Sequence, residues 1–356
     1  MDFENVPKSP ASEAPPEVVA AFMQYVQQNP SLFMGKQVSA KDLKPAPQHM
    51  YFRCIHCDGQ VLSGMDQCPS CGKATMQTLK RGDLLQGRYI VESQLMRSGG
   101  FGNLYSVLDR ADGDRPYVMK QLQHRRQVSD KDRALFEREG RLLASFDYHG
   151  IPRFQDSFSH DGALYLVLER IWGVTLGQYL KVKGPFSEDQ VMALLPQMLE
   201  VLNYLHQRSP AVIHRDVKPG NFMLTEDGHL YLIDFGAATD ILPRTDAVGA
   251  TGLPEELTNV FTKGFSAPEV LLGMAPQPAS DLYSLGTTLL FLLTGRHPYT
   301  HYDAMEGGFH TATLGVSEGL RAVIDRLTAF RVADRYRDAE EVLSDMVERG
   351  FIRPNS

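Results

Sequence analysis

The chain has 356 residues, of which 43% are hydrophobic, and it carries a net charge of −7. This composition is sufficient for a buried core, and no apolar run approaches the roughly 20 residues that cross a bilayer. Residues 1–7 have neither the basic end nor the apolar stretch of a secretory signal. The sequence has no basic patch with interleaved aromatic residues, the pattern that would suggest a nucleic-acid partner. We therefore expect a soluble, cytoplasmic protein without membrane or nucleic-acid partners, whose oligomeric state the composition does not decide.

Residues 1–50 are rich in proline and polar side chains, which favours an extended arm over a folded domain. Within this arm, residues 17–28 are predicted to form one short helix, which begins after Pro16 and ends before Pro30. The apolar face of the helix has two interpretations: it packs on the body of the chain, or it docks onto a partner.

The four cysteines of the chain form two Cys-x-x-Cys pairs within residues 51–77. Cys54 and Cys57 make the first pair, and Cys68 and Cys71 make the second. Two such turns can bring four thiolates around one ion in a tetrahedral site. A segment of about 25 residues is too small to fold on a core of its own, so a bound metal would hold it together. The module resembles a zinc ribbon or rubredoxin. Zinc is favoured over iron, and two disulfides or four free thiols are the alternatives.

A glycine-rich run follows, between strand-like segments at 89–91 and 105–108. Gly99, Gly100 and Gly102 would let the backbone turn tightly and offer N–H groups to phosphates. By itself, such a run is more often a plain hairpin, so its meaning depends on what comes next.

Lys120 ends the next short apolar strand, and a helix is predicted over residues 129–146. The expected apolar stripe of this helix consists of Leu135, Leu142, Leu143 and Phe146. Glu139 falls on the same stripe, where a buried carboxylate is unfavourable unless it is paired. Lys120 is its natural partner.

Residues 212–236 place four polar side chains at spacings that suit phosphoryl transfer. Asp216 can accept the proton of an attacking hydroxyl, and Lys218 can neutralise charge on the moving phosphoryl group. Asn221 and Asp234 supply the oxygen ligands that Mg²⁺ prefers. His-Arg-Asp alone would be a weak signal, but the full spacing together with Asp-Phe-Gly is specific.

In combination, these motifs resemble the eukaryotic-type serine/threonine protein kinase family, in its bacterial form with an N-terminal metal module. The resemblance covers residues 84–351 and implies an α+β, protein-kinase-like two-lobed fold preceded by a small metal-ribbon module. A small β-rich lobe with one key helix and a larger, mainly helical lobe would hold ATP between them. Lys218 after the catalytic aspartate is similar to the serine/threonine class.

The resemblance implies a role for each matching residue. The catalytic positions are Asp216, Lys218, Lys120 and Glu139. The nucleotide-binding positions are Met96, Gly99, Gly100, Phe101, Gly102, Leu104, Val118, Lys120, Glu169, Ile171, Asn221, Met223 and Asp234. Among them, Asn221 and Asp234 would hold Mg²⁺, and the backbone of a hinge at 168–171 would hold adenine.

The resemblance also implies an activation segment at 234–269. A loop of this length in a compact domain is usually functional or mobile. Thr262 would bond the catalytic aspartate and lysine, and Arg215 would meet a phosphorylated residue. The segment ends in Ala-Pro-Glu, whose Glu269 would pair with Arg335.

Two features depart from the family pattern. Arg97 replaces the first glycine of the loop, and the run between 298–299 and 320 is short, so the helix that usually follows the substrate-side helix is expected to be abbreviated. We expect transfer of the ATP γ-phosphoryl group to protein hydroxyls, including autophosphorylation. The alternatives are a pseudokinase scaffold, which Arg97 supports, and a kinase-like enzyme for a small molecule, against which Lys218 and the Ala-Pro-Glu segment argue.

Overall fold

The computed structural model describes residues 51–53, 60–62, 67–72, 79–97, 103–122, 130–160, 163–240, 264–303 and 308–351. These residues fall into two compact units. We call the unit formed by the described residues of 51–147 and by 152–171 the small lobe, and the unit formed by 148–151 and the described residues from 172 onward the large lobe. The predicted arm at 1–50, with its helix, lies outside the described residues.

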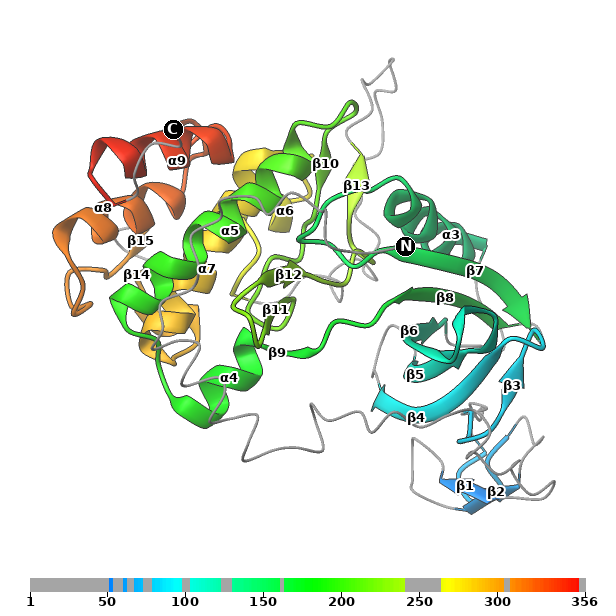
Figure 1. Ribbon diagram of the computed structural model, residues 1–356. Helices are drawn as coiled ribbons and strands as arrows, with labels where there is room; N and C mark the ends of the chain where they lie inside the picture. Colours follow the sequence, from blue (N-terminus) through cyan, green and yellow to red (C-terminus); the bar gives the residue numbers. More distant parts are fainter. Residues whose placement is uncertain are drawn as a thin grey trace. The chain divides into compact units, whose positions relative to one another are not determined.

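The small lobe is built on a six-stranded antiparallel sheet with the strand order β3-β4-β5-β6-β8-β7 (Figure 1). Its strands are β3 (Leu84–Leu85), β4 (Tyr89–Arg97), β5 (Asn103–Asp109), β6 (Arg115–Gln121), β7 (Phe154–His160) and β8 (Ala163–Glu169). Aliphatic, β-branched and aromatic side chains recur in these segments, as suits a pleated surface. Between β5 and β6, a single 3-10 turn, η2 (Arg110–Asp112), is capped by the Asp109 side chain.

The register of the sheet assigns its side chains to two faces. Lys120 lies opposite Leu104 on β5 and Leu166 on β8. The next residue, Gln121, lies opposite Asn103 and Tyr165. Because successive side chains of a strand point to opposite faces, the Lys120 set and the Gln121 set occupy different faces of the sheet. Both sets are used below.

Helix α3 (Asp130–Ala144) corresponds to the helix predicted at 129–146 and packs against β7 and β8. Phe136, Glu139 and Leu143 are buried, as a stripe with steps of three and four residues requires. The prediction that Leu135 belongs to this stripe is wrong, because its side chain is 43% exposed. The stripe is centred between Glu139 and Leu143, and Leu135 lies at its border.

The end of α3 also differs from the prediction. The Ser145 hydroxyl donates to the carbonyl of Leu142 at 2.7 Å, and the N–H of Phe146 donates to the carbonyl of Leu143 at 3.2 Å. These bonds close the last turn and end the helix two residues earlier than its apolar pattern suggests.

The cysteine module is described in part. Strands β1 (Tyr51–Arg53) and β2 (Gln60–Leu62) form an antiparallel hairpin, and residues 67–72 carry the second cysteine pair. Cys54 and Cys57 lie outside the described residues.

The large lobe is mainly helical, with short strands in its first half (Figure 1). Its first elements are β9 (Gly173–Thr175), α4 (Leu176–Lys183), α5 (Glu188–His206), β10 (Val212–Ile213), β11 (Phe222–Thr225), β12 (Leu230–Leu232) and β13 (Thr239–Asp240). The later ones are α6 (Pro268–Leu271), α7 (Pro278–Thr294), η4 (Pro298–His301), β14 (Tyr302–Asp303), β15 (Gly308–Phe309), α8 (Glu318–Leu327), η5 (Val332–Asp334) and α9 (Ala339–Glu348).

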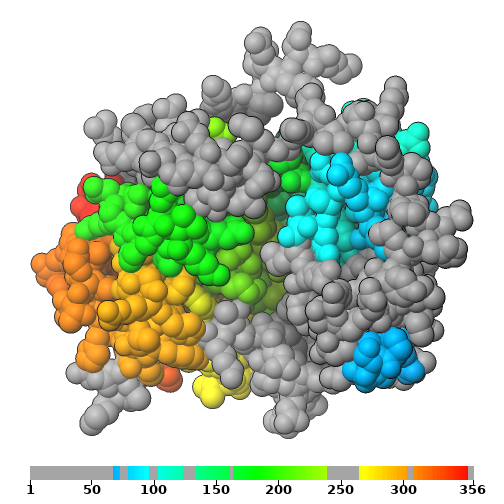
Figure 2. Space-filling view, turned by 90° about the horizontal axis from the view of Figure 1, so that it is seen from below, coloured from blue at the N-terminus to red at the C-terminus, as the bar shows by residue number. Residues whose placement is uncertain are grey.

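Local sequence explains where the main helices begin. Thr175 and Ser187 each form a capping box with the glutamine three residues later, at the starts of α4 and α5. Helix α7 is buried almost all round and is the centre of the lobe. Figure 2 shows the segment around α4 (green) beside the gold segment that includes α7, and the N–H of Phe186 donates to Leu292 O at 2.8 Å.

Between α7 and α8, the described residues form η4 and the β14–β15 hairpin and no α-helix. This agrees with the expected abbreviation of a helix in this part of the chain. None of the helices in the described part of the chain is long and apolar enough to span a bilayer.

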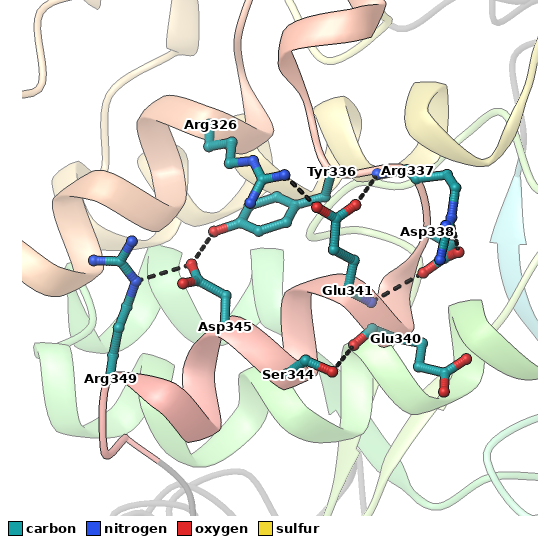
Figure 3. Close-up of polar contacts among 9 residues, drawn as sticks. All are labelled: Arg326, Tyr336, Arg337, Asp338, Glu340, Glu341, Ser344, Asp345 and Arg349. Atoms are coloured by element: carbon teal, nitrogen blue, oxygen red, sulfur yellow. Dashed lines mark hydrogen bonds and ion pairs between the residues drawn. The ribbon is translucent and has the colours of Figure 1, made fainter.

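The C-terminal elements are joined by a polar cluster around Tyr336, whose side chain is fully buried (Figure 3). The Arg326 guanidinium lies 4.0 Å from the centre of the Tyr336 ring, and the Tyr336 hydroxyl donates to Asp345. Asp345 also accepts from Arg349 at 2.9 Å, and Arg326 pairs with Glu341. Burial tends to raise the pKa of Asp345, but hydrogen bonds from Arg349 and Tyr336 outweigh it and hold the pKa below its usual range.

Candidate active site

In the small lobe, a buried ion pair joins β6 to α3. The Lys120 ammonium lies 2.7 and 2.9 Å from the two carboxylate oxygens of Glu139, and both residues are at most 9% exposed. Lys120 is held in place by strand pairing on both sides, and Glu139 by the buried stripe of the helix. The two residues that sequence reasoning paired are thus brought together.

The predicted nucleotide positions on the strands share the Lys120 face. Leu104 is directly opposite Lys120, and Val118 precedes Lys120 by two residues on β6. On β4, Met96 pairs with Leu104 and Arg97 pairs with Asn103, so the glycine-rich run connects two paired strand ends. Residues 98–102, which include Gly99, Gly100, Phe101 and Gly102, lie outside the described residues.

The predicted hinge, 168–171, begins in the last two residues of β8. The N–H of Glu169 donates to the Arg153 carbonyl at 2.8 Å, which ties the start of the hinge to β7. Arg170 is 13% exposed, lies 3.5 Å from Glu92 and donates to the Ser106 hydroxyl. Burial lowers the pKa of the Arg170 guanidinium, and the charge of Glu92 acts in the opposite direction. Ile171 ends this segment and is partly buried.

In the large lobe, the loop between β10 and β11 gathers three of the predicted catalytic or metal-binding residues. Lys218 Nζ lies 2.7 Å from Asp216 Oδ2. The Asn221 amide donates to the same oxygen at 2.9 Å and to the Asp216 carbonyl at 2.8 Å. Because Asn221 Nδ2 is directed at Asp216, the amide oxygen of Asn221 is the atom left to accept or to bind a cation. The carboxylate of Asp216 is therefore held beside one cation and one amide.

Asp234 follows β12 and lies next in the chain to a residue that is bonded to Asn221. The N–H of Ile233 donates to Asn221 O at 2.8 Å. Asp234 itself has φ 66, a left-handed conformation that is sparsely populated for residues other than glycine. The carboxylate of Asp234 and the amide oxygen of Asn221 form a donor set of hard oxygens, which suits Mg²⁺.

Met223 lies on β11 between β12 and β9, opposite Tyr231 and Thr175. Close packing surrounds it, because a Cβ at Gly173 would lie 2.3 Å from the Leu224 carbonyl oxygen. Only glycine allows β9 to approach β11 this closely.

One buried carboxylate, Asp281 on α7, binds the backbone of the loop that contains Asp216. Its oxygens accept from the N–H groups of His214 at 2.7 Å and Arg215 at 2.8 Å, and one lies 3.0 Å from His206 Nε2. These bonds hold the left-handed backbone of Arg215, whose φ is 67. His214 is fully buried against Phe235, and this burial lowers the pKa of its imidazole.

The role of Asp281 was not assigned from the sequence, although an acid in the first turn of an otherwise apolar helix was a usable signal. An unpaired carboxylate at that position would be strongly unfavourable. What the pattern lacked was the partner, because His214 and Arg215 are more than 60 residues away in the chain.

The end of the predicted activation segment is anchored by a second buried pair. Arg335 binds Glu269 through two bonds of 2.9 Å, and the Ser280 hydroxyl donates to Glu269 at 2.7 Å. Burial tends to raise the pKa of Glu269, but the hydrogen bonds from Arg335 and Ser280 outweigh it and lower the pKa. Thr262 lies outside the described residues.

The second cysteine pair forms a tight turn. The N–H of Ser70 donates to Cys68 Sγ at 3.4 Å, and the N–H of Gly72 donates to the Cys68 carbonyl at 2.8 Å. Gly72 has φ 69, which a glycine adopts freely. Cys68 is 1% exposed and Cys71 is partly buried. Among the described residues, no group of three or more potential metal ligands lies together; the first cysteine pair is outside this part of the chain.

Comparison with known proteins identifies relatives for most of the chain. The model of the protein kinase domain family matches residues 90–347. Serine/threonine-protein kinase F of Synechocystis sp. is 37% identical over 280 residues, which are 73% of this chain and 55% of that protein. Serine/threonine-protein kinase PknA of Nostoc sp. is 36% identical over 270 residues, or 73% of this chain and 47% of that protein.

The chain therefore spans about half the length of these curated relatives. Among solved structures, the kinase domain of PknI from Mycobacterium tuberculosis has a TM-score of 0.59 at 24% identity and covers 77% of this chain and 100% of that one. At this identity, the likeness supports the two-lobed fold alone.

Proposed function

The chain belongs to the protein kinase domain family, and we propose that it transfers the γ-phosphoryl group of ATP to serine or threonine hydroxyls of proteins, itself included. The observation that carries this proposal is the Asp216 loop. There, an ammonium and an amide each lie within 2.9 Å of one carboxylate oxygen of Asp216, and a second carboxylate, Asp234, follows a nearby strand. The matching half on the small lobe is the buried Lys120–Glu139 pair.

In this proposal, Asp216 accepts the proton of the attacking hydroxyl, and Lys218 neutralises charge on the phosphoryl group as it moves. Lys120, oriented by Glu139, binds the phosphates of ATP. The reaction breaks the bond between the γ-phosphorus and its bridging oxygen and forms a bond to the substrate oxygen, while ADP leaves with the electron pair.

Two Mg²⁺ ligands come from the large lobe. Asn221 and Asp234 offer one amide and one carboxylate oxygen, and their donor chemistry fits this ion. When bound, Mg²⁺ would neutralise negative charge on the phosphates of ATP. Around the base, we propose contacts from Met96, Leu104, Val118 and Met223 and from the hinge backbone at Glu169 and Ile171. The glycine-rich residues Gly99, Gly100, Phe101 and Gly102 would cover the phosphates.

A nucleotide-binding pseudokinase is the second candidate, and Arg97 at the first glycine position is its support. However, Arg97 is a paired residue of strand β4, and the extended backbone of a strand does not require glycine. A kinase-like enzyme for small molecules is disfavoured by the Ala-Pro-Glu motif and its buried Glu269–Arg335 pair. In the protein kinase family, this motif ends the segment that faces the protein substrate.

We also propose that Cys54, Cys57, Cys68 and Cys71 bind one Zn²⁺, with iron as the alternative metal. The support is the spacing of the pairs and the turn at Cys68, where a backbone N–H points at the sulfur. The proposed organisation is an arm at 1–50, the metal module at 51–77 and the catalytic domain at 84–351, in a cytoplasmic protein.

The test of the kinase function is a phosphorylation assay with labelled ATP, Mg²⁺ and a generic basic protein. We expect Lys120→Met and Asp234→Asn each to lower kcat by about 100-fold or more, because electrostatic groups at a transition state contribute roughly 3 kcal/mol each. Wild-type kcat in either folded variant would contradict the assigned roles. Binding of ATP by the wild-type protein without any transfer would favour the pseudokinase.

The test of the metal site is elemental analysis of the purified chain. One zinc or iron per molecule is expected, and the Cys68→Ser variant should lose most of it. Absence of both metals, with all four thiols reactive in the native protein, would contradict the site.

A further inference from the structure

The face of the small-lobe sheet that carries Gln121 holds a polar network inside an apolar cluster. Gln121, Asn103 and Tyr105 are 6%, 2% and 0% exposed. The apolar side chains around them include Leu85, Tyr89, Val91, Val107, Met119 and Val167. Buried amides are unfavourable in such surroundings unless their donors and acceptors are used. The network is therefore expected to have a purpose that apolar residues would not serve.

The network is centred on Gln121, which accepts two hydrogen bonds and donates one. Tyr105 Oη donates to Gln121 Oε1 at 3.1 Å, and Asn103 Nδ2 donates to the same oxygen at 3.2 Å. Gln121 Nε2 donates to Tyr165 Oη at 3.0 Å, and Gln94 Nε2 donates to Asn103 Oδ1 at 3.3 Å. This pattern commits the only proton of the Tyr105 hydroxyl and leaves its oxygen as an acceptor.

That acceptor is taken by the chain segment that leads from the cysteine module. The N–H of Leu79 donates to Tyr105 Oη at 3.1 Å, and the Leu79 side chain packs against the apolar cluster. The next N–H, that of Lys80, donates to Asp83 Oδ2 at 2.7 Å, so the segment enters the lobe in a defined register. Residues 72–78 separate Cys71 from this anchor and can carry it no further than about 28 Å.

We propose that this face is the docking site for the chain's own linker between the cysteine module and the kinase domain, and that Tyr105 and Gln121 are positioning residues through which the docked linker acts on Lys120. The part that concerns Lys120 rests on the kinase function proposed above. Gln121 follows Lys120 on β6 and points to the opposite face of the sheet. Gln121, with two accepted bonds and one donated bond, restrains β6 on the face opposite Lys120, which lies 2.7 Å from Glu139.

In this proposal, a change in the cysteine module, such as loss of its metal, acts by breaking the hydrogen bond from the Leu79 N–H to Tyr105 Oη. Such a signal alters ATP binding only if the docked and released states differ in their contacts, and the Leu79–Tyr105 bond is one such difference. The simpler alternative is a linker that covers the sheet without influencing Lys120. The experiments below separate the two.

The first experiment measures amide hydrogen exchange of the full chain in wild type, Tyr105→Phe and Tyr117→Phe. Tyr117 is a matched control, since it belongs to the same apolar cluster and its hydroxyl bonds Asp112 at 2.7 Å, outside the network. We expect the Leu79 amide to exchange about 2- to 12-fold faster in Tyr105→Phe, as loss of one hydrogen bond implies, and at the wild-type rate in Tyr117→Phe. Equal exchange in Tyr105→Phe and wild type would overturn the docking, whether or not the protein is an active kinase.

The second experiment tests the coupling to Lys120 by a double-mutant cycle between Tyr105→Phe and Cys68→Ser. The measured quantities are the Kd for ATP, by titration calorimetry, and the KM and kcat of transfer. We expect each single variant to weaken ATP binding about threefold, with a smaller change in kcat. The double variant should bind ATP no more weakly than the single variant with the higher Kd, because both substitutions release the same segment. Tyr117→Phe should bind as wild type. An unchanged Kd in Tyr105→Phe, or strictly additive effects, would overturn the coupling while leaving the docking to be judged by exchange.

Discussion

The two lobes hold their predicted functional side chains in different ways. In the small lobe, Lys120 lies on β6 and pairs with Glu139 on helix α3. In the large lobe, the loop that contains Asp216 is held by Asp281 through two backbone N–H groups, and by Asn221 through two further bonds. An arrangement with several independent bonds resists the loss of any single one, whereas the small-lobe pair depends on how α3 and β6 are placed relative to each other.

This contrast suggests that the two lobes contribute differently to control. The large-lobe loop is preorganised, with even its left-handed residue Arg215 fixed by a bond to α7. The small-lobe pair can be formed or broken by movement of one helix or of β6. Control of activity is therefore expected to act on the small lobe, which is also the lobe that receives the linker from the cysteine module.

The largest effect is expected where the large-lobe network converges. Asp281→Ala should lower the free energy of unfolding by about 3–5 kcal/mol, because it leaves two buried N–H groups and His206 without their acceptor. Chemical denaturation measures this loss, and kcat should fall with it even in the folded fraction. Asp281→Asn keeps the shape and one acceptor oxygen, so it should lose less. A loss below about 1 kcal/mol in Asp281→Ala would mean that the loop is held by other contacts.

The next effect concerns the small-lobe pair and separates its functional role from its structural one. Lys120→Met should lower the free energy of unfolding by roughly 3 kcal/mol, because Glu139 is left buried without its partner. The double variant Lys120→Met/Glu139→Leu should recover most of that stability, because two apolar residues can replace a buried ion pair. Transfer activity should stay absent in both. If stability is not recovered in the double variant, the pair is structural as well as functional.

The smallest effect lies far from the catalytic residues in the chain, in the cluster of Figure 3. The pKa of Asp345 is held below its usual range, so its bonds stabilise the fold above about pH 4 and this contribution is lost as the pH falls through the lowered pKa. Asp345→Asn should lower the free energy of unfolding at pH 7 by about 1 kcal/mol. The variant should also lose stability less steeply than wild type below pH 4, in acid titrations of unfolding, with kcat unchanged at pH 7. An identical acid profile would contradict the assigned contribution of Asp345.

Much of the candidate site was predictable from spacing. The motif residues of the large lobe lie within one short stretch of chain, so their grouping needs little more than two short strands and a loop. The Lys120–Glu139 contact was inferred from helix phase, and the structure places the two side chains together. The same phase argument failed for Leu135, because periodicity indicates a stripe but not which border residue the neighbouring strands cover.

Other features could not be read from the chain. Gln121 and Asn103 look like ordinary polar residues of half-exposed strands, and only the sheet register shows that they share one buried face. Arg170 reads as a solvated residue of the hinge, yet it is partly buried and contacts Glu92 and Ser106. In each case, the deciding partner lies on another strand at a distance that no local pattern encodes.

The sequence by itself determined the family, the catalytic and metal-binding candidates and the main strands and helices, because these depend on residue type and on short spacings. The tertiary structure decided which polar side chains are buried and what satisfies them. Asp281 and Gln121 are the examples. The reason is physical: whether a buried charge or amide is tolerated depends on donors and acceptors supplied from distant parts of the chain, as His214 and Asp281 show across 67 residues.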